Sequence, residues 1–260
     1  MMSFLTRVSM FRGAFVLVAV SVAGMGCSSD PVFPNATPGR EGILGFAFGG
    51  NQTEECFGAC KADRPIAAGA TSQVNITEGD PTRRFRGRVP DSVGLEFREL
   101  FFCERGDGTF REVEFGQTCA EAEELTSLRI AEVLPTQPGT FALEVLDDGE
   151  LVDSIELDAR PVVGARFMTA RGPEIIDELT IGHGGSDDIQ PLLRGEGDTS
   201  LYGDDFEFEW SSDDPAVAEI GTEPTGMGIG SVPVHSVGPG QTNLRLHAFG
   251  IEIVLPVFVE

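Results

Sequence analysis

The sequence predicts an all-β protein built from antiparallel sandwiches, and three observations carry that expectation. Hydrophobic residues make up 41% of the 260 residues, which is enough for a buried core. The 33 glycines and 16 prolines suit many short strands joined by turns. From residue 42 onwards several stretches place apolar residues at every second position, and helical spacing is not sustained. We expect one or two helical turns at most, at residues 120–125.

The chain begins with the features of an export signal. Arg7 and Arg12 precede an apolar run at residues 14–20, and small residues follow as far as Gly26. The apolar run is too short to span a bilayer, which takes about 20 residues. We therefore expect residues 1–26 to be a signal peptide. Ordinary cleavage after Ala23 is the alternative to cleavage directly before Cys27.

Cys27 resembles the lipobox cysteine of bacterial lipoproteins, which is lipidated and becomes the new N-terminus. Gly24 and Met25 depart from the Leu and the Ala or Ser that this family prefers before the cysteine. The resemblance implies an acyl anchor, such as palmitate, and an exported Gram-negative protein. Ser28, where Asp would imply retention in the inner membrane, implies the outer membrane. Residues 27–41 contain Ser and Pro without periodicity, and we expect them to form a flexible tether.

The remaining four cysteines predict two disulfide bonds. Cys56, Cys60, Cys103 and Cys119 form an even set, which in an exported chain is typical of disulfides. The spacing of Cys56 and Cys60 also suits a metal site, but none of the three histidines is near them in sequence. We therefore expect no metal and no cofactor. The pairing stays open, because four cysteines allow three connectivities.

Strand patterns and turn signals alternate along the rest of the chain. Pro-Gly at residues 138–139 and Asp-Asp-Gly at residues 147–149 are examples of the turns. One long central strand is expected at residues 93–102. The other expected strands span residues 42–48, 71–77, 109–115, 128–130, 141–145, 151–157, 162–168, 206–210, 217–220, 229–234, 243–247 and 251–259.

An internal repeat divides the body of the chain into two. Pro-Gly pairs at residues 138–139 and 239–240 are each followed, at the same offsets, by two apolar residues that face the core. A further hairpin then ends each copy. A domain boundary near Arg160 follows, which gives domains at residues 42–160 and 161–260. The expected core residues of the repeated strand are Leu143, Val145, Leu244 and Leu246.

Residues 208–220, FEWSSDDPAVAEI, resemble the bacterial immunoglobulin-like group 2 domain of intimin- and invasin-type adhesins. That family shows W-S-S-x-x-P-x-V-A-x-V, and a glycine-containing turn follows it. The resemblance covers about residues 161–260 and implies an immunoglobulin-like sandwich with Trp210 and Val217 in its core. We expect residues 42–160 to form a second immunoglobulin-like sandwich, which carries the disulfides.

Charge and motif content narrow the function. A formal net charge of −24 disfavours binding to nucleic acid or to anionic lipid headgroups. The His-Gly-Gly turn at residues 183–185 lacks the Gly-x-Ser-x-Gly elbow of esterases, and the glycines at residues 226–230 lack the lysine of a phosphate loop. We therefore expect no enzymatic activity.

Calcium is weighed because aspartate pairs lie at expected loop ends. Oxygen-rich loops of this kind can bind Ca²⁺, but no Asp-x-Asp-x-Asp-Gly loop is present. Solvated turn carboxylates are the favoured interpretation. The pairs occupy residues 147–148, 187–188, 204–205 and 213–214.

These observations predict a non-enzymatic envelope lipoprotein that acts as a surface-exposed structural or interaction module of adhesin type. Its partner would be a protein or a polysaccharide of unknown identity, and the membrane would be reached through the N-terminal lipid. The alternative is a periplasm-facing accessory subunit of an envelope transport or export complex. The sequence does not choose between the two faces of the outer membrane, and it does not give the oligomeric state.

Overall fold

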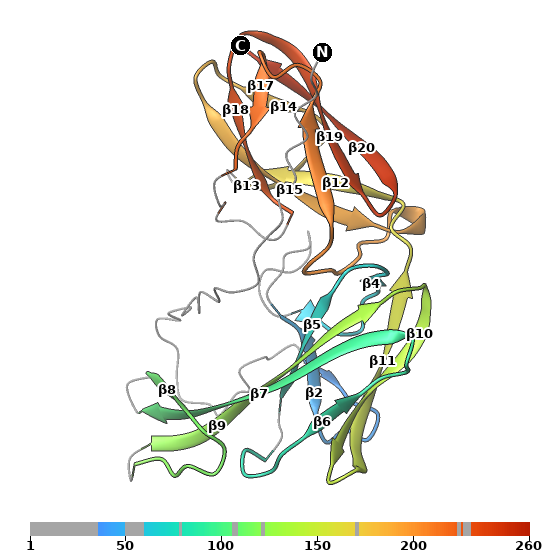
Figure 1. Cartoon of the computed structure of the whole chain (residues 1–260), viewed down its shortest axis with the longest axis vertical. Coiled ribbons are helices and arrows are strands. Elements are labelled where there is room, and N and C mark those ends of the chain that lie inside the picture. Colours follow the sequence, from blue (N-terminus) through green and yellow to red (C-terminus); the bar gives the residue numbers. More distant parts are fainter. Residues whose placement is uncertain are drawn as a thin grey trace.

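The computed structural model describes residues 36–49, 60–77, 80–105, 109–120, 123–169, 172–222, 225 and 230–260. Strands dominate these residues, and their one helical element is a 3-10 turn, η1 (Glu196–Asp198). Figure 1 shows two bodies stacked along the long axis, with the earlier strands below and the later strands above. The all-β prediction is confirmed. No helix in this described part is long and apolar enough to cross a membrane.

The N-terminal body consists of two sheets. Its strands are β1 (Thr37–Pro38), β2 (Gly45–Phe48), β3 (Cys60–Lys61), β4 (Ile66–Ala67), β5 (Ser72–Thr77), β6 (Arg86–Arg88), β7 (Val93–Arg105), β8 (Phe110–Val113), β9 (Glu123–Pro135), β10 (Gly139–Asp147) and β11 (Glu150–Arg160). One sheet has the order β1-β2-β5-β9-β7-β8, with β3 paired to β2. The other has the order β4-β11-β10-β6.

The C-terminal body also consists of two sheets. Its strands are β12 (Gly164–Thr169), β13 (Gly172–Ile176), β14 (Leu179–Ile181), β15 (Ser186–Arg194), β16 (Phe208–Ser212), β17 (Ala218–Ile220), β18 (Val232–Ser236), β19 (Gly240–Ala248) and β20 (Ile251–Val259). The sheet orders are β13-β12-β15-β18-β17 and β14-β20-β19-β16. The strands up to β11 belong to the first two sheets, and the strands from β12 onwards belong to the other two.

The two bodies share one strand plan. The path β2-β5-β9-β7 corresponds to β12-β15-β18-β17, and β4-β11-β10-β6 corresponds to β14-β20-β19-β16. In the N-terminal body β4 pairs parallel with β11, and in the C-terminal body β14 pairs parallel with β20. The other pairs along these paths are antiparallel. The repeated strands begin at Gly139 and Gly240, whose φ angles of 145° and 149° disfavour any residue with a Cβ. The repeat seen in sequence therefore extends to eight strands.

The expected core residues lie as follows. Leu143, Val145, Leu244 and Leu246 are all completely buried. Trp210 is 5% exposed, and its indole N–H donates to the carbonyl of Gly230 over 3.2 Å. Val217 is half-buried and packs against the edge of the same C-terminal cluster. Alternate residues of β10 and β19 thus supply both cores.

Three sequence expectations need correction. Folded structure begins before residue 42, because β1 pairs with β2 and the backbone N–H groups of Glu41, Ile43 and Leu44 all donate to the buried carboxylate of Asp153. No helix forms around Leu125, since pairing with β7 along β9 overrides a weak local pattern. No strand is expected from the sequence between residues 168 and 206, whereas the structure has β13, β14 and β15 there. β15 is buried almost throughout, but its acidic residues and Pro191 interrupt the apolar pattern by which a buried strand is recognised in a sequence.

An arm extends from the N-terminal sandwich. β7 and β9 pair over all thirteen residues, which carries them beyond the two-sheet body, and β8 adds to β7 there (Figure 1). A disulfide joins Cys103 of β7 to Cys119, with 5.5 Å between the Cα atoms. A small separate core of Phe101, Cys103 and Val113 fills this arm. The corresponding C-terminal strands are only three and five residues long.

The two bodies exchange residues at their junction. Tyr202, from the connection between β15 and β16, is 1% exposed and belongs to the N-terminal core, where its ring stacks on Phe48 at a centroid distance of 4.3 Å. In return, Ala67 and Ala70 belong to the C-terminal core. We call this reciprocal contact, between residues 65–73 and 200–205, the interlock.

Backbone hydrogen bonds hold the interlock in register. Tyr202 N–H donates to Pro65 O over 3.0 Å, and Ala67 N–H donates to Tyr202 O over 2.7 Å. Gln73 N–H donates to a carboxylate oxygen of Asp204 over 2.6 Å, and the Tyr202 hydroxyl donates to the other over 2.9 Å. A Cβ on Gly203 would lie 2.9 Å from that of Ala70, so glycine permits this close approach.

Replacing Tyr202 tests the interlock. Tyr202→Ala should lower the free energy of unfolding by about 3 to 5 kcal/mol, because a large buried ring leaves a cavity. Tyr202→Phe, which keeps the ring and loses only the hydroxyl, should cost about 1 to 2 kcal/mol. Urea unfolding followed by circular dichroism gives both values. Equal stability of Tyr202→Ala and the wild type would contradict the interlock.

A second prediction concerns pH. Burial raises the pKa of Asp204 to about 7, against the hydrogen bonds from Gln73 and Tyr202, and nearby Glu132 and Asp205 act in the same direction as burial. The folded state therefore binds the proton more tightly than the unfolded state, and this group's contribution to stability falls as pH rises from about 4 to about 7. Asp204→Asn, which mimics the protonated acid, should gain stability over wild type at pH 8. The difference should vanish near pH 4 in thermal melts; a pH-independent difference would contradict it.

Candidate functional site

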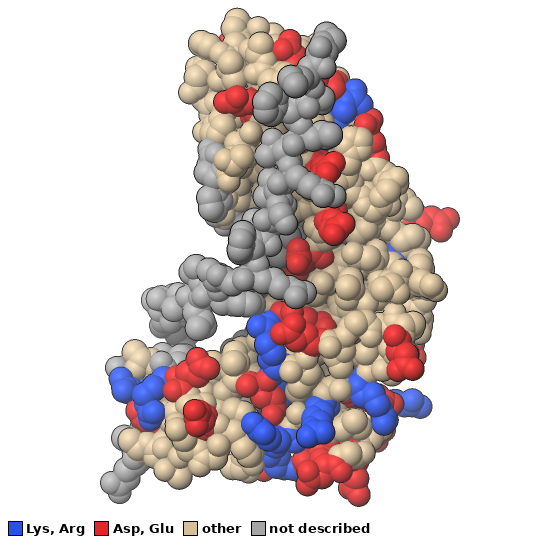
Figure 2. Space-filling model, viewed as in Figure 1, with Lys and Arg blue, Asp and Glu red and all other residues tan. Residues whose placement is uncertain are grey.

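A basic segment stands out on this acidic chain. Four of the 18 basic residues fall within residues 83–88, at Arg83, Arg84, Arg86 and Arg88. They occupy the loop before β6 and β6 itself, at the end of a sheet. In Figure 2 most Lys and Arg atoms on the visible face lie over the lower body, which is the N-terminal sandwich. The charge of the protein is therefore unevenly distributed.

Arg129, a residue of β9, holds this basic segment in place. Its side chain is 1% exposed and donates to Glu99 Oε1 over 2.9 Å and to the carbonyl of Asp80 over 2.8 Å. Its guanidinium also lies 4.3 Å from the ring centroid of buried Phe85. Burial lowers the pKa of Arg129, whereas the hydrogen bond and charge of Glu99 raise it. A buried cation with these partners fixes the path of the chain into β6.

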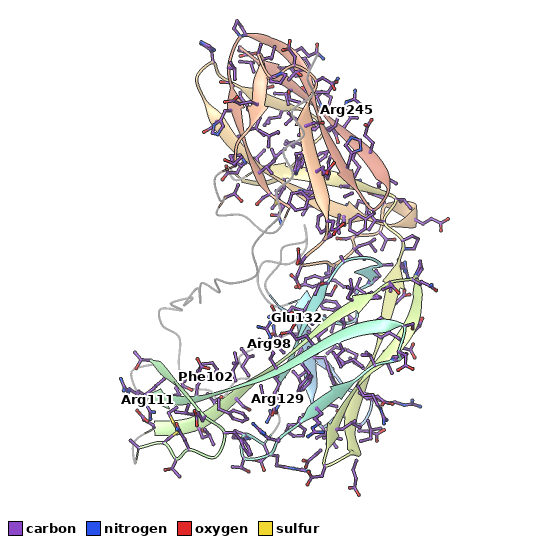
Figure 3. All side chains as sticks on the ribbon, in the orientation of Figure 1. Arg98, Phe102, Arg111, Arg129, Glu132 and Arg245 are labelled. Carbon is purple, nitrogen blue, oxygen red and sulfur yellow. A yellow bond between two sulfur atoms is a disulfide. The ribbon has the colours of Figure 1, made fainter. Side chains whose placement is uncertain are left out.

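Figure 3 places Arg129 in the middle of the lower body, near Arg98 and Glu132, which form an ion pair across β7 and β9. Phe102 and Arg111 lie further out, in the arm. There Glu123 accepts hydrogen bonds from Arg111 over 2.8 Å and from Arg105 over 3.0 Å, and these bonds lower its pKa to about 2. Arginine–carboxylate pairs thus stiffen both the sheet and its extension.

The four basic residues of the segment differ in their partners. Arg83 forms an ion pair with Asp147, and Arg88 forms one with Glu144. Arg84 lies over the ring of Phe115, 4.7 Å from its centroid. Within the described part of the chain no carboxylate forms an ion pair with Arg84 or with Arg86, and both side chains are exposed. Two positive charges are therefore open to a partner.

These arginines border a groove of about 890 Å³. Its lining residues come from both sheets of the N-terminal sandwich: from β6 and the loop before it, from β7, and from the end of β10 and the turn to β11. Leu95 and Phe97 of β7 are its apolar lining residues, which we call the apolar floor, and Asp148 follows Asp147, the ion-pair partner of Arg83, in the turn. The lining residues are Arg84, Phe85, Arg86, Gly87, Leu95, Phe97, Glu99, Leu146, Asp148 and Gly149.

The arm contributes to the same region. Phe115, which is 40% exposed, contacts both Arg84 and Phe101 of the arm core. Phe115 lies between β8 and Cys119, so the disulfide holds the loop that carries it. A cation–π contact of this kind contributes about 0.5 to 1 kcal/mol at an exposed site. The arm and the basic segment are therefore adjacent and coupled.

The other residues predicted as sites are distributed as follows. Cys27 and Cys56 lie outside the described residues, and Cys60 begins β3. Cys103 and Cys119 are disulfide-bonded. Together with Glu123, their ligand atoms lie within 4.8 Å of one another, the one grouping of potential metal ligands among the described residues. Because the two sulfurs are bonded to each other, this grouping is a disulfide and not a metal centre.

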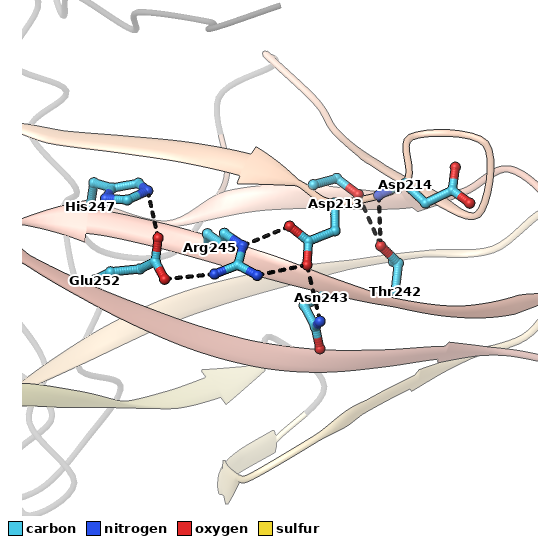
Figure 4. Close-up of polar contacts among 8 residues, drawn as sticks. Asp213, Asp214, Thr242, Asn243, Arg245, His247 and Glu252 are labelled. Atoms are coloured by element: carbon cyan, nitrogen blue, oxygen red, sulfur yellow. Dashed lines mark hydrogen bonds and ion pairs between the residues drawn. The ribbon is translucent and has the colours of Figure 1, made fainter. Parts of the chain in front are cut away.

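Three of the aspartate pairs weighed for calcium have members that protein donors engage. Arg245 Nε and Nη2 donate to the two oxygens of Asp213 over 2.6 and 2.9 Å, and Asn243 adds a bond of 3.0 Å (Figure 4). These bonds lower the pKa of Asp213 to about 2. Asp147 pairs with Arg83, and Asp204 accepts from Gln73.

Sequence reasoning missed the groove. The signal that could have identified it is the density of arginine at residues 83–88, since a chain of this net charge would gain from spreading its few cations among its acids. The apolar floor and the buried Arg129 gave no local signal. Their roles depend on pairing between strands far apart in sequence.

Comparisons with known proteins give no identity for this chain. No family model matches the chain, and no curated protein matches it. Among solved structures, it resembles the Yersinia pseudotuberculosis adhesin InvE, at 15% identity and a TM-score of 0.30, over 76% of this chain and 56% of that one. A 282-residue intimin fragment, in complex with the intimin-binding domain of its translocated receptor, gives 10% identity and 0.27, over 75% and 61%.

A β-glycosidase from Bacteroides vulgatus gives 12% identity and a TM-score of 0.31, over 75% of this chain and 23% of that one. This chain thus spans less than two thirds of each of these three proteins. At TM-scores well below 0.5 these likenesses carry no argument about this chain, and its function has to be argued from the site.

The role of Arg129 can be tested by substitution. Arg129→Met should lower the free energy of unfolding by about 3 to 5 kcal/mol, because it leaves Glu99 buried without its partner. Adding Glu99→Leu should recover part of that loss. Arg88→Met, which removes an exposed ion pair, should change stability by about 0 to 1 kcal/mol. Chemical denaturation of the four proteins checks this, and equal losses for Arg129→Met and Arg88→Met would refute it.

Proposed function

We propose that this chain is a non-enzymatic, lipid-anchored protein of the bacterial envelope that binds a partner through the groove of its N-terminal sandwich. The observation that carries the proposal is the pair of exposed arginines, Arg84 and Arg86, which lack a carboxylate partner in the described residues and border an apolar floor. Convergent polar groups around an apolar depression are typical of binding sites.

The groove favours binding over catalysis. Its lining contains no Ser, Cys or His, so it offers no hydroxyl or thiol nucleophile of the serine or cysteine type and no imidazole base. Of its two carboxylates, Glu99 is engaged by Arg129 and by the N–H of Phe85, and Asp148 is an exposed turn residue. A pair of free carboxylates facing one another, as glycoside hydrolysis requires, is not formed by these two residues.

The interlock supports a role in presentation. Tyr202, Ala67 and Ala70 join the two cores, so the bodies share apolar packing instead of a flexible connection. Two rigidly connected sandwiches hold the groove and the arm at a fixed orientation relative to each other. Such rigidity reduces the entropy lost when a partner binds.

The anchor and the domain plan belong to the same proposal. Residues 1–26 act as signal peptide, Cys27 carries the lipid, and the chain from Ser28 towards β1 connects it to two domains, the first from β1 to Arg160 and the second at residues 161–260. The surface face of the outer membrane is favoured by the resemblance of residues 208–220 to the adhesin module. The periplasmic face, in an accessory subunit of an export complex, is the alternative.

Cys27→Ala tests the anchor. Cells fed radiolabelled palmitate should label the wild-type protein, and the substitution should abolish the label while the protein is still exported. Cys60→Ala, which removes a different cysteine, serves as the control and should leave labelling intact. An unlabelled wild-type protein would remove the anchor from the proposal. Proteinase added to intact cells then decides the face, since digestion indicates the surface and protection indicates the periplasm.

A further inference from the structure

We propose that the groove receives an extended acidic polypeptide segment, which adds as a β-strand to the free edge of β6. This inference rests on the proposed function, because it names the partner of the same site. The four-stranded sheet ends at β6, which bonds to β10 on one side. In the described residues no strand pairs with its other side. An edge strand leaves alternate backbone N–H and C=O groups unpaired, and these can template a further strand.

The side chains around β6 define what the added strand would carry. Arg84, Arg86 and Arg88 are exposed at alternate positions, whereas buried Phe85 and half-buried Gly87 face inward. A Cβ on Gly87 would lie 2.5 Å from Phe97 Cδ2 and 3.1 Å from Leu95 Cδ2, so glycine keeps the backbone close to the apolar floor. A strand beside β6 would meet arginine on one face and the floor on the other. Alternating acidic and apolar residues fit both.

The charges leave a positive surplus for such a strand. Asp147 neutralises Arg83, Glu144 neutralises Arg88, and Arg129 neutralises Glu99. Arg84 and Arg86 remain, opposed in the groove by Asp148 alone. Two spaced guanidinium groups suit carboxylates that recur at every second residue of a strand.

A polypeptide is favoured over an acidic polysaccharide by the backbone edge. The spacing of unpaired groups along β6 matches the repeat of another β-strand. Of the two aromatic rings nearest to this segment, Phe85 is buried and the guanidinium of Arg129 lies over it, whereas Phe115 is 40% exposed and Arg84 lies over its ring. A sugar that stacked on Phe115 would therefore compete with Arg84 for that ring.

The test uses the full exported protein in detergent and three nine-residue peptides. One alternates Glu with Val, the second alternates Lys with Val, and the third is the Glu–Val peptide with alternate amides N-methylated. Fluorescence anisotropy of labelled peptides should show binding of the first only. Because N-methylation keeps every charge and removes main-chain donors, its effect isolates strand addition from simple charge attraction.

Substitutions then locate the site. Arg84→Glu and Arg86→Glu should each weaken the Glu–Val peptide about tenfold, because one charge-assisted contact is replaced by repulsion. Arg40→Glu makes the same change of net charge at an exposed position outside the groove, and it should weaken binding less than about twofold. Arg84→Gln and Arg86→Gln give milder losses in the same order and guard against misfolding. Circular dichroism and Trp210 emission report the fold of each variant.

Four outcomes would overturn the inference. They are no binding of the Glu–Val peptide, equal binding of its N-methylated form, equal losses from Arg40→Glu and Arg86→Glu, and arginine-dependent binding of polygalacturonate in place of the peptide. Self-association that Arg86→Glu disrupts would replace the separate polypeptide with a second copy of this chain. None of these outcomes bears on palmitate labelling or on proteinase access, so the lipid anchor and the membrane face of the proposed function are tested independently of this inference.

Discussion

The arrangement of this protein depends on one exchange of side chains between its two sandwiches. Tyr202, which belongs by sequence to the C-terminal half, packs against Phe48 in the N-terminal core. Ala67 and Ala70, from the N-terminal half, pack in the C-terminal core. Neither core is closed by its own sheets alone. Asp204 makes this contact sensitive to protonation, because its carboxylate is held beside Tyr202 with a pKa raised to about 7 by burial. A junction built in this way fixes orientation, since separating the bodies would expose an aromatic ring and several backbone groups at once.

Within that frame, a buried cation shapes the candidate site. Arg129 would be costly in the interior if it lacked partners, and it finds them in Glu99, two backbone carbonyls and the Phe85 ring. The same contacts hold the loop of residues 80–85, so the arginines that follow leave the loop at defined positions. Buried Arg129, which no partner can contact, thus positions the exposed charges of Arg84 and Arg86.

How much the sequence reveals depends on the range of each interaction. Alternation over adjacent residues correctly predicts β7, β10, β19 and β20, and the repeat at Gly139 and Gly240 reflects a backbone conformation that glycine favours. By contrast, β15 is central in its sheet and buried almost throughout, so it lacks the alternation that marks a half-buried strand. The groove, the interlock and the Cys103–Cys119 pairing all join residues whose proximity only the tertiary fold creates. Of the candidate site, sequence contains the arginine cluster and nothing of its apolar floor.

The largest difference between the two sandwiches is the arm, and its disulfide links the arm to the redox environment of the protein. The strand plan repeats over eight strands, yet β7 and β9 continue into an arm that β17 and β18 lack. Three buried residues form too small a core to hold such an extension, so the Cys103–Cys119 crosslink supplies order that apolar packing cannot. That bond also holds the loop of Phe115, on which Arg84 rests. An oxidising compartment therefore favours the arm and, through Phe115, the position of one of the two arginines at the groove.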